Sequence, residues 1–336
     1  MTFLSKNRNI ISRIYVLALI YSWTMLMACT QEDTLMKQQS PHFHLSLQKK
    51  TKFSEKHYRI YDSSGKPSTL ESIIYQFGLV DVAFLGEMHD DPVAHYIQEL
   101  ILRETTDRYW RNAYSSKRRQ IVLSMEMFER DIQMILDEYL FKIIDDHHFL
   151  SCVRPWRNYI QDYHPMVKFA QKNNLKVLAA NAPRRYVHRV AQKGPQALDD
   201  LSTFAKTCIA PLPIKPPSEK MKKKFDDLQQ KESMRIAHEE ISSTSHFVDA
   251  QNLWDATMAY SIHEELSNTP RVLILHLNGF FHSQSGIGIP EHLTHYRPDV
   301  KMMLINIVRN ESFPKFHPSL KNTGDFVIIT EPNIWR

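Results

Sequence analysis

Six short apolar runs, separated by helix-like stretches, constrain the fold of this chain more than any other feature. The runs are nearly continuous in apolar residues, as expected for strands that are covered on both faces. Helical periodicity lies between several of them, and strands that alternate with helices predict an α/β fold in three layers. We expect a mostly parallel or mixed central sheet flanked by helices, with a smaller helical subdomain. The runs are Val80–Leu85, Ile121–Met125, Val177–Ala180, Val272–Leu277, Met302–Ile307 and Phe326–Ile329, and a further short strand is expected at Tyr58–Tyr61.

Four helices are expected around these strands. Asp91-Pro92 has the pattern of an N-cap followed by the first helical residue, so a helix should run from Pro92 to about Arg103. Another helix should end at Gly78, because glycine is favoured just past a helix C-terminus. The helical periods cover Leu70–Phe77, Pro92–Arg103, Asp162–Asn173 and Asp249–Leu266.

Residues 1–28 have the layout of a lipoprotein signal peptide. A basic start is followed by an apolar stretch over about 14–27 and then by Cys29. The stretch is shorter than the roughly 20 residues that span a bilayer, but it suits a cleavable export signal. Cleavage before Cys29 would leave its thiol to receive lipid and attach the protein to a membrane, and Thr30 favours the outer membrane. The alternatives are an uncleaved anchor and a cysteine that stands here by chance.

The rest of the chain divides into a tether and one large domain. Residues 29–56 are polar, which predicts a tether, and 57–336 should form the α/β domain. The stretch 186–247 shows no strand pattern and is rich in proline and charge. Together with 128–163, it is expected to form a helical cap.

Charge and cysteine usage exclude some classes of protein. The formal net charge is +5, and three of these charges, on Lys6, Arg8 and Arg13, precede Cys29, which leaves about +2. That balance gives no support for nucleic-acid binding. After Cys29 only Cys152 and Cys208 remain, too few for a disulfide framework or a CxxC metal site, and they either pair or stay free.

Polar side chains follow four of the apolar runs. In open α/β sheets ligands bind beyond the carboxyl ends of the strands, so these side chains should converge on one polar pocket. The residues are Glu87 and His89 after the first run, Glu126 and Arg130 after the second, Asn181 and Arg184 after the third, and Asn278 and His282 after the fourth.

Four of these residues form a candidate metal-binding or catalytic set. Glu87 and His89 are two positions apart and point the same way on an extended segment. With Glu126 and His282 they make a histidine–carboxylate set of the type that holds zinc, manganese or iron. The alternatives are that Glu87 caps the helix that begins at Pro92, and that Glu126 pairs with Arg130 or Arg184.

Other histidines and tyrosines are weaker candidates. His147 and His148 follow two aspartates and are expected on a solvated helix face. Any of four tyrosines could ligate ferric haem, although each could equally be structural, and no motif selects among them. They are Tyr58, Tyr159, Tyr163 and Tyr186.

Five motifs occur in order over about Val80–Leu293: Leu85–Asp90, Ser124–Arg130, Asn181–Arg184, Ala250–Ala259 and Asn278-Gly279 followed by His282. They resemble the motifs of the ChaN-like proteins, which are haem-binding lipoproteins implicated in iron uptake. The resemblance implies a large α/β domain with a smaller helical one, and a dimer that holds haem between subunits through a tyrosine. It also implies a pocket lined by the four histidine and glutamate residues above. In this chain Phe280-Phe281 precedes His282, whereas many relatives place the histidine directly after the glycine.

Together with the signal-peptide pattern, this resemblance implies a lipid-anchored haem-binding protein that acts in haem or iron uptake, with an outer-membrane haem receptor and a second copy of the chain as expected partners. The haem-ligating tyrosine stays unassigned, and the pocket candidates are Arg130, Asn181, Arg184 and Asn278. The alternative is a metal-dependent hydrolase, a peptidase or esterase like the TIKI and erythromycin esterase relatives. In that reading a divalent metal is held, and catalysis carried, by Glu87, His89, Glu126 and His282.

Overall fold

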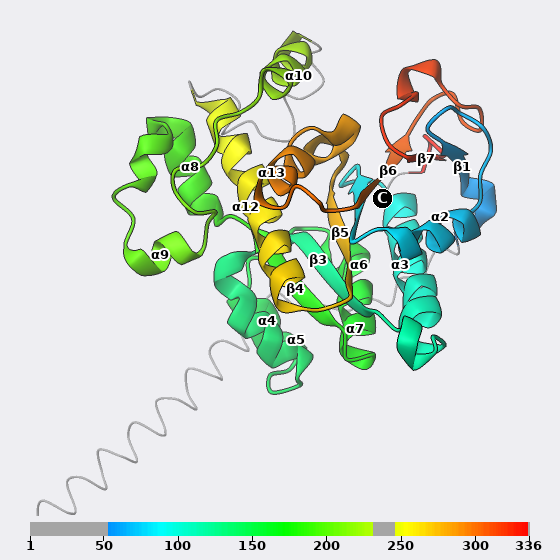
Figure 1. The fold of residues 1–336 in the computed structure, drawn as a ribbon, viewed down its shortest axis with the longest axis horizontal. Helices are drawn as coiled ribbons and strands as arrows, with labels where there is room; N and C mark the ends of the chain where they lie inside the picture. The colour runs from blue at the N-terminus through cyan, green and yellow to red at the C-terminus, as the bar shows by residue number, and fades with distance from the viewer. Residues whose placement is uncertain (1–52, 231–245, 335–336) are drawn as a thin grey trace, which may run out of the picture. The chain divides into compact units, whose positions relative to one another are not determined.

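In the part of the chain that the structure describes, seven strands form one mixed sheet in the order β1-β7-β6-β2-β5-β3-β4 (Figure 1). β1 pairs antiparallel with β7, and the other five pairings are parallel. The predicted α/β fold with a mixed sheet is confirmed, and each predicted apolar run overlaps a strand, although β2 begins two residues after the predicted Val80. The strands are β1 (Tyr58–Asp62), β2 (Val82–Glu87), β3 (Gln120–Glu129), β4 (Lys176–Asn181), β5 (Val272–Gly279), β6 (Met302–Arg309) and β7 (Phe326–Thr330).

The computed structural model describes residues 53–230 and 246–334. The predicted signal peptide, Cys29 and most of the predicted tether therefore lie outside the described residues. Residues 53–336 form one unit by their internal contacts. None of the helices in the described part is both long enough and apolar enough to span a membrane.

The two central strands, β2 and β5, are buried along their whole length, which explains why their sequences are apolar without alternation. Successive residues nevertheless belong to different hydrophobic clusters. Ala83 and Leu85 pack in one cluster, and Val82 and Phe84 pack in the other. The sheet is thus the middle of three layers, with a separate core on each face.

Helices from different parts of the chain cover the two faces (Figure 1). The segments predicted to form a cap, 128–163 and 186–247, contribute their described residues to different clusters. On the first face lie α2 (Leu70–Gln76), α3 (Pro92–Thr106), α4 (Gln133–Leu140), α5 (Asp146–Cys152), α6 (Tyr159–Asp162) and α7 (His164–Lys172). On the second lie α8 (Arg184–Lys193), α10 (Glu219–Gln230), α12 (Phe247–Asn268) and α13 (Ile289–Tyr296), and a short helix α9 spans Thr203–Thr207.

The helix ends agree with the sequence at one position and differ at two. Oδ1 of Asp91 accepts hydrogen bonds from the amides of Val93 and Ala94, so the predicted N-cap of α3 is confirmed. The predicted glycine cap of α2 is wrong, because a 3₁₀ helix over Phe77–Leu79 continues the chain through Gly78. The helix predicted over Asp162–Asn173 is present as α7, but it begins at His164, because Asp162 ends the separate helix α6; Pro165 in the first turn of α7 suits that start.

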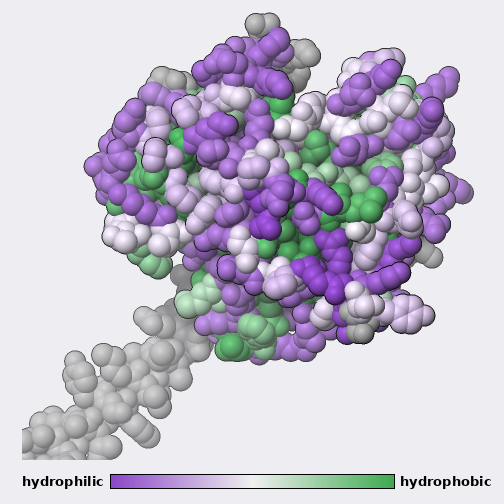
Figure 2. Space-filling view, viewed as in Figure 1, coloured by the Kyte–Doolittle hydropathy of each residue, from purple (hydrophilic) through white to green (hydrophobic). Residues whose placement is uncertain are grey.

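Hydrophilic residues cover much of the face seen in Figure 2, and hydrophobic residues show at its centre and near α4 and α5. Three large apolar side chains around α4 are exposed, those of Met134, Phe141 and Ile143. The two cysteines in the described residues, Cys152 and Cys208, are free thiols, the first exposed and the second buried.

Candidate functional site

The carboxyl ends of β2, β3 and β5 bring together the four residues singled out in the sequence. Nδ1 of His89 lies 2.9 Å from Oε1 of Glu87. Oε1 of Glu126 lies 4.0 Å from Nε2 of His89 and 3.6 Å from Nε2 of His282. Because β5 lies between β2 and β3 and is parallel to both, the residues at these three ends meet at one edge of the sheet.

Glu87, the last residue of β2, is almost completely buried and has three polar partners. Its Oε1 accepts hydrogen bonds from His89 and from the hydroxyl of Tyr163, and its Oε2 lies 3.3 Å from Nε2 of His95. Burial raises the pKa of Glu87, but the charge of His95 and the hydrogen bonds from both histidines lower it to about 2. Glu87 is thus held as a carboxylate, and the alternative role as helix cap belongs to Asp91 instead.

His95 joins the site from the inner side of α3. Its two ring nitrogens each lie 3.3 Å from a carboxylate oxygen, Nε2 from Glu87 and Nδ1 from Asp162. Burial lowers the pKa of His95, but these two carboxylates raise it to about 9. The imidazolium is therefore the internal counter-ion of two buried acids, a role that the sequence analysis missed.

His282 reaches the site through the short 3₁₀ helix Phe280–His282 that follows β5. Its Nδ1 lies 2.5 Å from Oδ1 of Asp255 on α12, and its Nε2 faces Glu126. Burial lowers the pKa of His282, but Glu126 and Asp255 raise it to about 9. Burial raises the pKa of Asp255. The extra Phe280-Phe281 is accommodated by one 3₁₀ turn, and Asp255, also missed from the sequence, lies inside a motif noted there.

The residues joined by these contacts form a histidine–carboxylate cluster, which consists of Glu87, His89, His95, Glu126, Asp162, Asp255 and His282. Two glycines permit its close packing. A Cβ on Gly279 would lie 2.9 Å from Cε1 and Nε2 of His89, and the amide of Gly279 donates a 2.7 Å hydrogen bond to Oε2 of Glu126. Gly288 has φ +90°, and a Cβ there would lie 2.7 Å from Oδ2 of Asp255. The backbone can approach the histidines and acids only where these positions lack a side chain.

A cavity of about 830 Å³ opens over the cluster. His89 and Glu126 line it, and the side chain of His89 is 36% exposed. Trp156 and Trp254 also line it, and the ring of Trp156 meets that of His89 edge-on at 4.7 Å. Four exposed arginines lie around it, at positions 154, 157, 184 and 185. Polar groups thus meet aromatic walls in a space within the size range of small-molecule sites.

The remaining pocket candidates separate into two that line the cavity and two that do not. Arg184 and Asn181 line it, and Nδ2 of Asn181 donates to the backbone carbonyl of Glu126. Arg130 instead pairs with Glu264 at 2.8 Å. Asn278 is buried and donates to Oγ of Ser283, which braces the turn after β5.

None of the four tyrosines considered as haem ligands lines the cavity. Tyr58, Tyr159 and Tyr163 are buried, and Tyr186 is half-buried under the guanidinium of Arg185. Burial raises the pKa values of Tyr159 and Tyr163 well above the ordinary value. A phenolate is therefore disfavoured at both positions.

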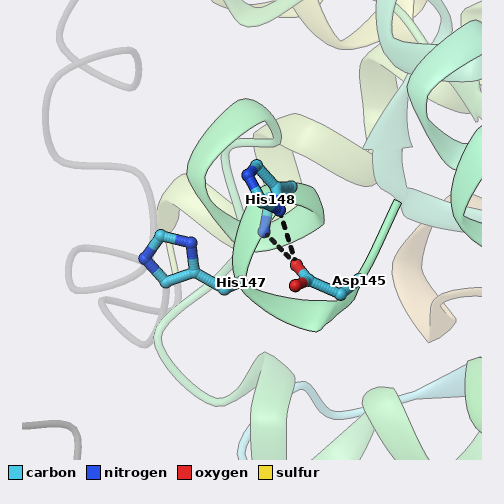
Figure 3. Close-up of side chains that lie close together, drawn as sticks. All are labelled: Asp145, His147 and His148. Atoms are coloured by element: carbon cyan, nitrogen blue, oxygen red, sulfur yellow. Dashed lines mark hydrogen bonds and ion pairs between the residues drawn. The ribbon is translucent and has the colours of Figure 1, made fainter. Parts of the chain in front are cut away.

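Among the residues described, the one group of three or more metal-binding side chains whose donor atoms all lie within 4.8 Å is Asp145, His147 and His148 (Figure 3). These residues are exposed at the start of α5, as predicted from the sequence, and Nδ1 of His148 lies 2.8 Å from Oδ1 of Asp145. In the described residues, the donor atoms of Glu87, His89, Glu126 and His282 do not all lie within that distance of one another. The carboxylates of that set are neutralised by neighbouring imidazoles.

Comparison with known proteins gives matches of unequal extent. The structure of ChaN of Campylobacter jejuni, described as binding haem cofacially, is 21% identical and has a TM-score of 0.60, covering 82% of this chain and 98% of that chain. The type III effector HopBA1 is 9% identical with a TM-score of 0.43, over 79% of this chain and 94% of that chain. Protein RETICULATA-RELATED 5, chloroplastic, of Arabidopsis thaliana is 26% identical over 149 residues, which are 42% of this chain. The match covers only 20% of that relative's length.

The family described as "Haem-binding uptake, Tiki superfamily, ChaN" matches residues 74–293. The matched region contains β2 to β5, the helices between them and every member of the histidine–carboxylate cluster. Since the match extends over more than half of the 336 residues, this chain belongs to the ChaN family of the Tiki superfamily.

Proposed function

We propose that this protein binds haem in the cavity over Glu126, with His89 as the residue that contacts the iron. The family match supports haem as the ligand, and the observation that carries the proposal is the setting of His89. Its Nδ1 donates to Glu87, so once the ring is neutral the lone pair lies on Nε2. Burial lowers the pKa of His89, but the hydrogen bond to Glu87 and the charge of Glu126 raise it, so the ring must release a proton before Nε2 can bind iron. A histidine that ligates a metal with one ring nitrogen commonly donates its other ring N–H to a carboxylate, which fixes the orientation of the ring.

The donor set of the cavity fits an imidazole ligand better than a phenolate. Haem iron accepts a histidine, and His89 is the histidine that lines the cavity in the described part of the chain. The family's tyrosine ligation finds no matching residue there, because Tyr159 and Tyr163 are buried in the core and Tyr163 donates to Glu87. This chain would therefore hold haem through His89 rather than through any of these tyrosines.

A haem titration of the protein that lacks residues 1–28 tests the proposal. We expect a saturable Soret shift at about one haem per chain, and loss of that spectrum in His89→Ala. His148→Ala is the matched control, because His148 is an exposed histidine on α5 that does not line the cavity. An unchanged spectrum in His89→Ala would exclude this ligand, and weak, non-saturating spectra of the wild type would exclude specific haem binding.

A metal-dependent hydrolase is the second candidate, and one observation favours it. In both His89 and His282, Nδ1 contacts a carboxylate, that of Glu87 or Asp255. Nε2 of each ring faces Oε1 of Glu126, at 4.0 Å from His89 and 3.6 Å from His282. A divalent ion held by these groups would activate water, and a neighbouring carboxylate would act as general base. Binding would have to displace the protons that the two imidazoles hold.

Metal content measured after dialysis against zinc or manganese tests this second function. The measurement uses a His147→Ala/His148→Ala background, which removes the exposed surface cluster. One ion per chain that disappears with Glu126→Gln, together with ester or peptide hydrolysis, would support the hydrolase. An ion content below one tenth per chain would exclude it.

The cellular setting is also a proposal, and it is supported by the sequence. Lipid on Cys29 would attach the protein to the outer membrane, where a haem receptor would supply its ligand for iron uptake. Cys29→Ser should move the protein from the membrane to the soluble fraction. Sedimentation with and without haem would show whether two copies assemble around the ligand, and a monomer under both conditions would exclude the dimer.

A further inference from the structure

Four arginines surround the open side of the cavity, and carboxylates neutralise two of them. Nη2 of Arg154 lies 2.6 Å from Oε2 of Glu129 and 2.6 Å from Oδ1 of Asp131. Nη1 of Arg185 lies 2.5 Å from Oδ2 of the same aspartate. Two acids therefore satisfy two of the four guanidinium groups.

The other two, Arg157 and Arg184, are exposed, line the same cavity and have no acidic group within 4.0 Å anywhere in 53–230 or 246–334. Glu126 also lines the cavity but does not pair with either arginine, because it accepts a hydrogen bond from the amide of Gly279 and faces His282. A pair of unpartnered guanidinium groups beside a cavity attracts anions, and their planar donors match a carboxylate in two parallel hydrogen bonds.

Aromatic walls complete the cavity. Trp156 comes from the segment before α6, and Trp254 comes from α12 on the opposite face of the sheet, where it is only 6% exposed. Indole rings in a cavity favour a flat, apolar ligand body. The cavity thus offers a place for a planar ring system on the inside and for acidic groups at the rim.

We propose that Arg157 and Arg184 bind the carboxylate groups of a flat aromatic ligand whose ring system packs against Trp156 and Trp254. If the ligand is haem, as the proposed function has it, these arginines hold its two propionates. The contact is separate from the iron contact of His89, so each can be removed without the other.

The test compares metal-free protoporphyrin with its dimethyl ester, which has the same rings without the acidic groups. We expect wild type to bind the free acid about two- to thirtyfold more tightly, as for two partly exposed ion pairs. Arg157→Gln/Arg184→Gln should bind both forms with the affinity that wild type shows for the ester. Arg108→Gln, an exposed arginine outside the cavity, should keep the full preference. The preference should also shrink at 1 M salt, because salt screens exposed charges.

The iron-free probe separates this proposal from the haem proposal. A free-acid preference that the double variant loses upholds the arginine contact even if haem itself gives no Soret shift. A haem spectrum that depends on His89, combined with equal affinities of wild type for acid and ester, overturns the arginine contact and leaves haem binding intact. If neither porphyrin binds, quenching of tryptophan fluorescence by 2-naphthoate decides, and no quenching overturns the proposal.

Discussion

Nδ1 of His282 lies 2.5 Å from Oδ1 of Asp255, and this contact ties the end of β5 to the middle of α12. It turns Nε2 of His282 towards Glu126 and supplies part of the negative charge that keeps the ring protonated. The charge of the cluster therefore depends on a residue from a helix on one face of the sheet.

Replacing Asp255 with asparagine should lower the pKa of His282 from about 9, because one of the two carboxylates that raise it is removed. A nearby charge shifts a pKa by about 1–3 units, and the fall should lie in that range. NMR titration of the histidine Cε1 protons measures it. Asp249→Asn, on the same helix and paired with His246, should leave His282 unchanged. An unaltered pKa in Asp255→Asn would show that the contact does not control the protonation of His282.

Replacing His95 with glutamine should destabilise the fold strongly. The variant would leave Glu87 and Asp162 buried without the imidazolium that lies 3.3 Å from each. Loss of one partner from a buried ion pair costs about 3–5 kcal/mol of unfolding free energy. Urea denaturation followed by circular dichroism measures this, with His147→Gln as an exposed control expected within about 0.5 kcal/mol of wild type. A loss below about 1 kcal/mol in His95→Gln would contradict the proposed counter-ion role.

Stability should fall as the pH rises from about 6.5 to about 9. Both His95 and His282 have folded-state pKa values of about 9, raised from 6.5, so the folded protein holds their protons more tightly than the unfolded chain. Their contribution is complete below pH 6.5 and is lost as the pH passes through 9. Urea midpoints at pH 6.5, 8 and 9.5 should decrease in that order. The decrease should be smaller in Asp255→Asn, and a midpoint that does not change with pH would count against the raised values.

Replacing Gly86 with alanine should lower the stability of the fold, whereas replacing Gly279 with alanine should abolish haem binding. A Cβ on Gly86 would lie 2.8 Å from Cα of Phe280, and backbone cannot move aside easily, so a cost of about 1–3 kcal/mol is expected. A Cβ on Gly279 would meet the ring of His89, whose side chain is 36% exposed and can turn away. Gly279→Ala should therefore keep most of its stability but lose the haem spectrum. Thermal unfolding and haem titration of both variants check this, and a haem spectrum like that of wild type in Gly279→Ala would contradict it.

Much of the site could be predicted from the sequence because its residues lie next to recognisable strands in the chain. Glu87, Glu126 and His282 each follow an apolar run closely, and a polar residue at the end of an apolar run can be recognised without knowing the fold. The rule that parallel strands end together then placed these residues at one edge of the sheet. The cap of α3 was equally local, because Asp91 bonds to amides only two and three positions further on.

The sequence by itself determined the alternation of strands and helices, and with it the α/β fold and the acids and histidines at the strand ends, since these depend on periodicity and on neighbours in the chain. Only the tertiary structure decided that His95 and Asp255 turn into that cluster, because the inward face of a helix is set by what packs against it. The same holds for the arginines: within 53–230 and 246–334, Arg154 and Arg185 pair with acids and Arg157 and Arg184 do not. The charge that a side chain meets depends on segments far away in the sequence, and only folding brings those segments within a few ångströms.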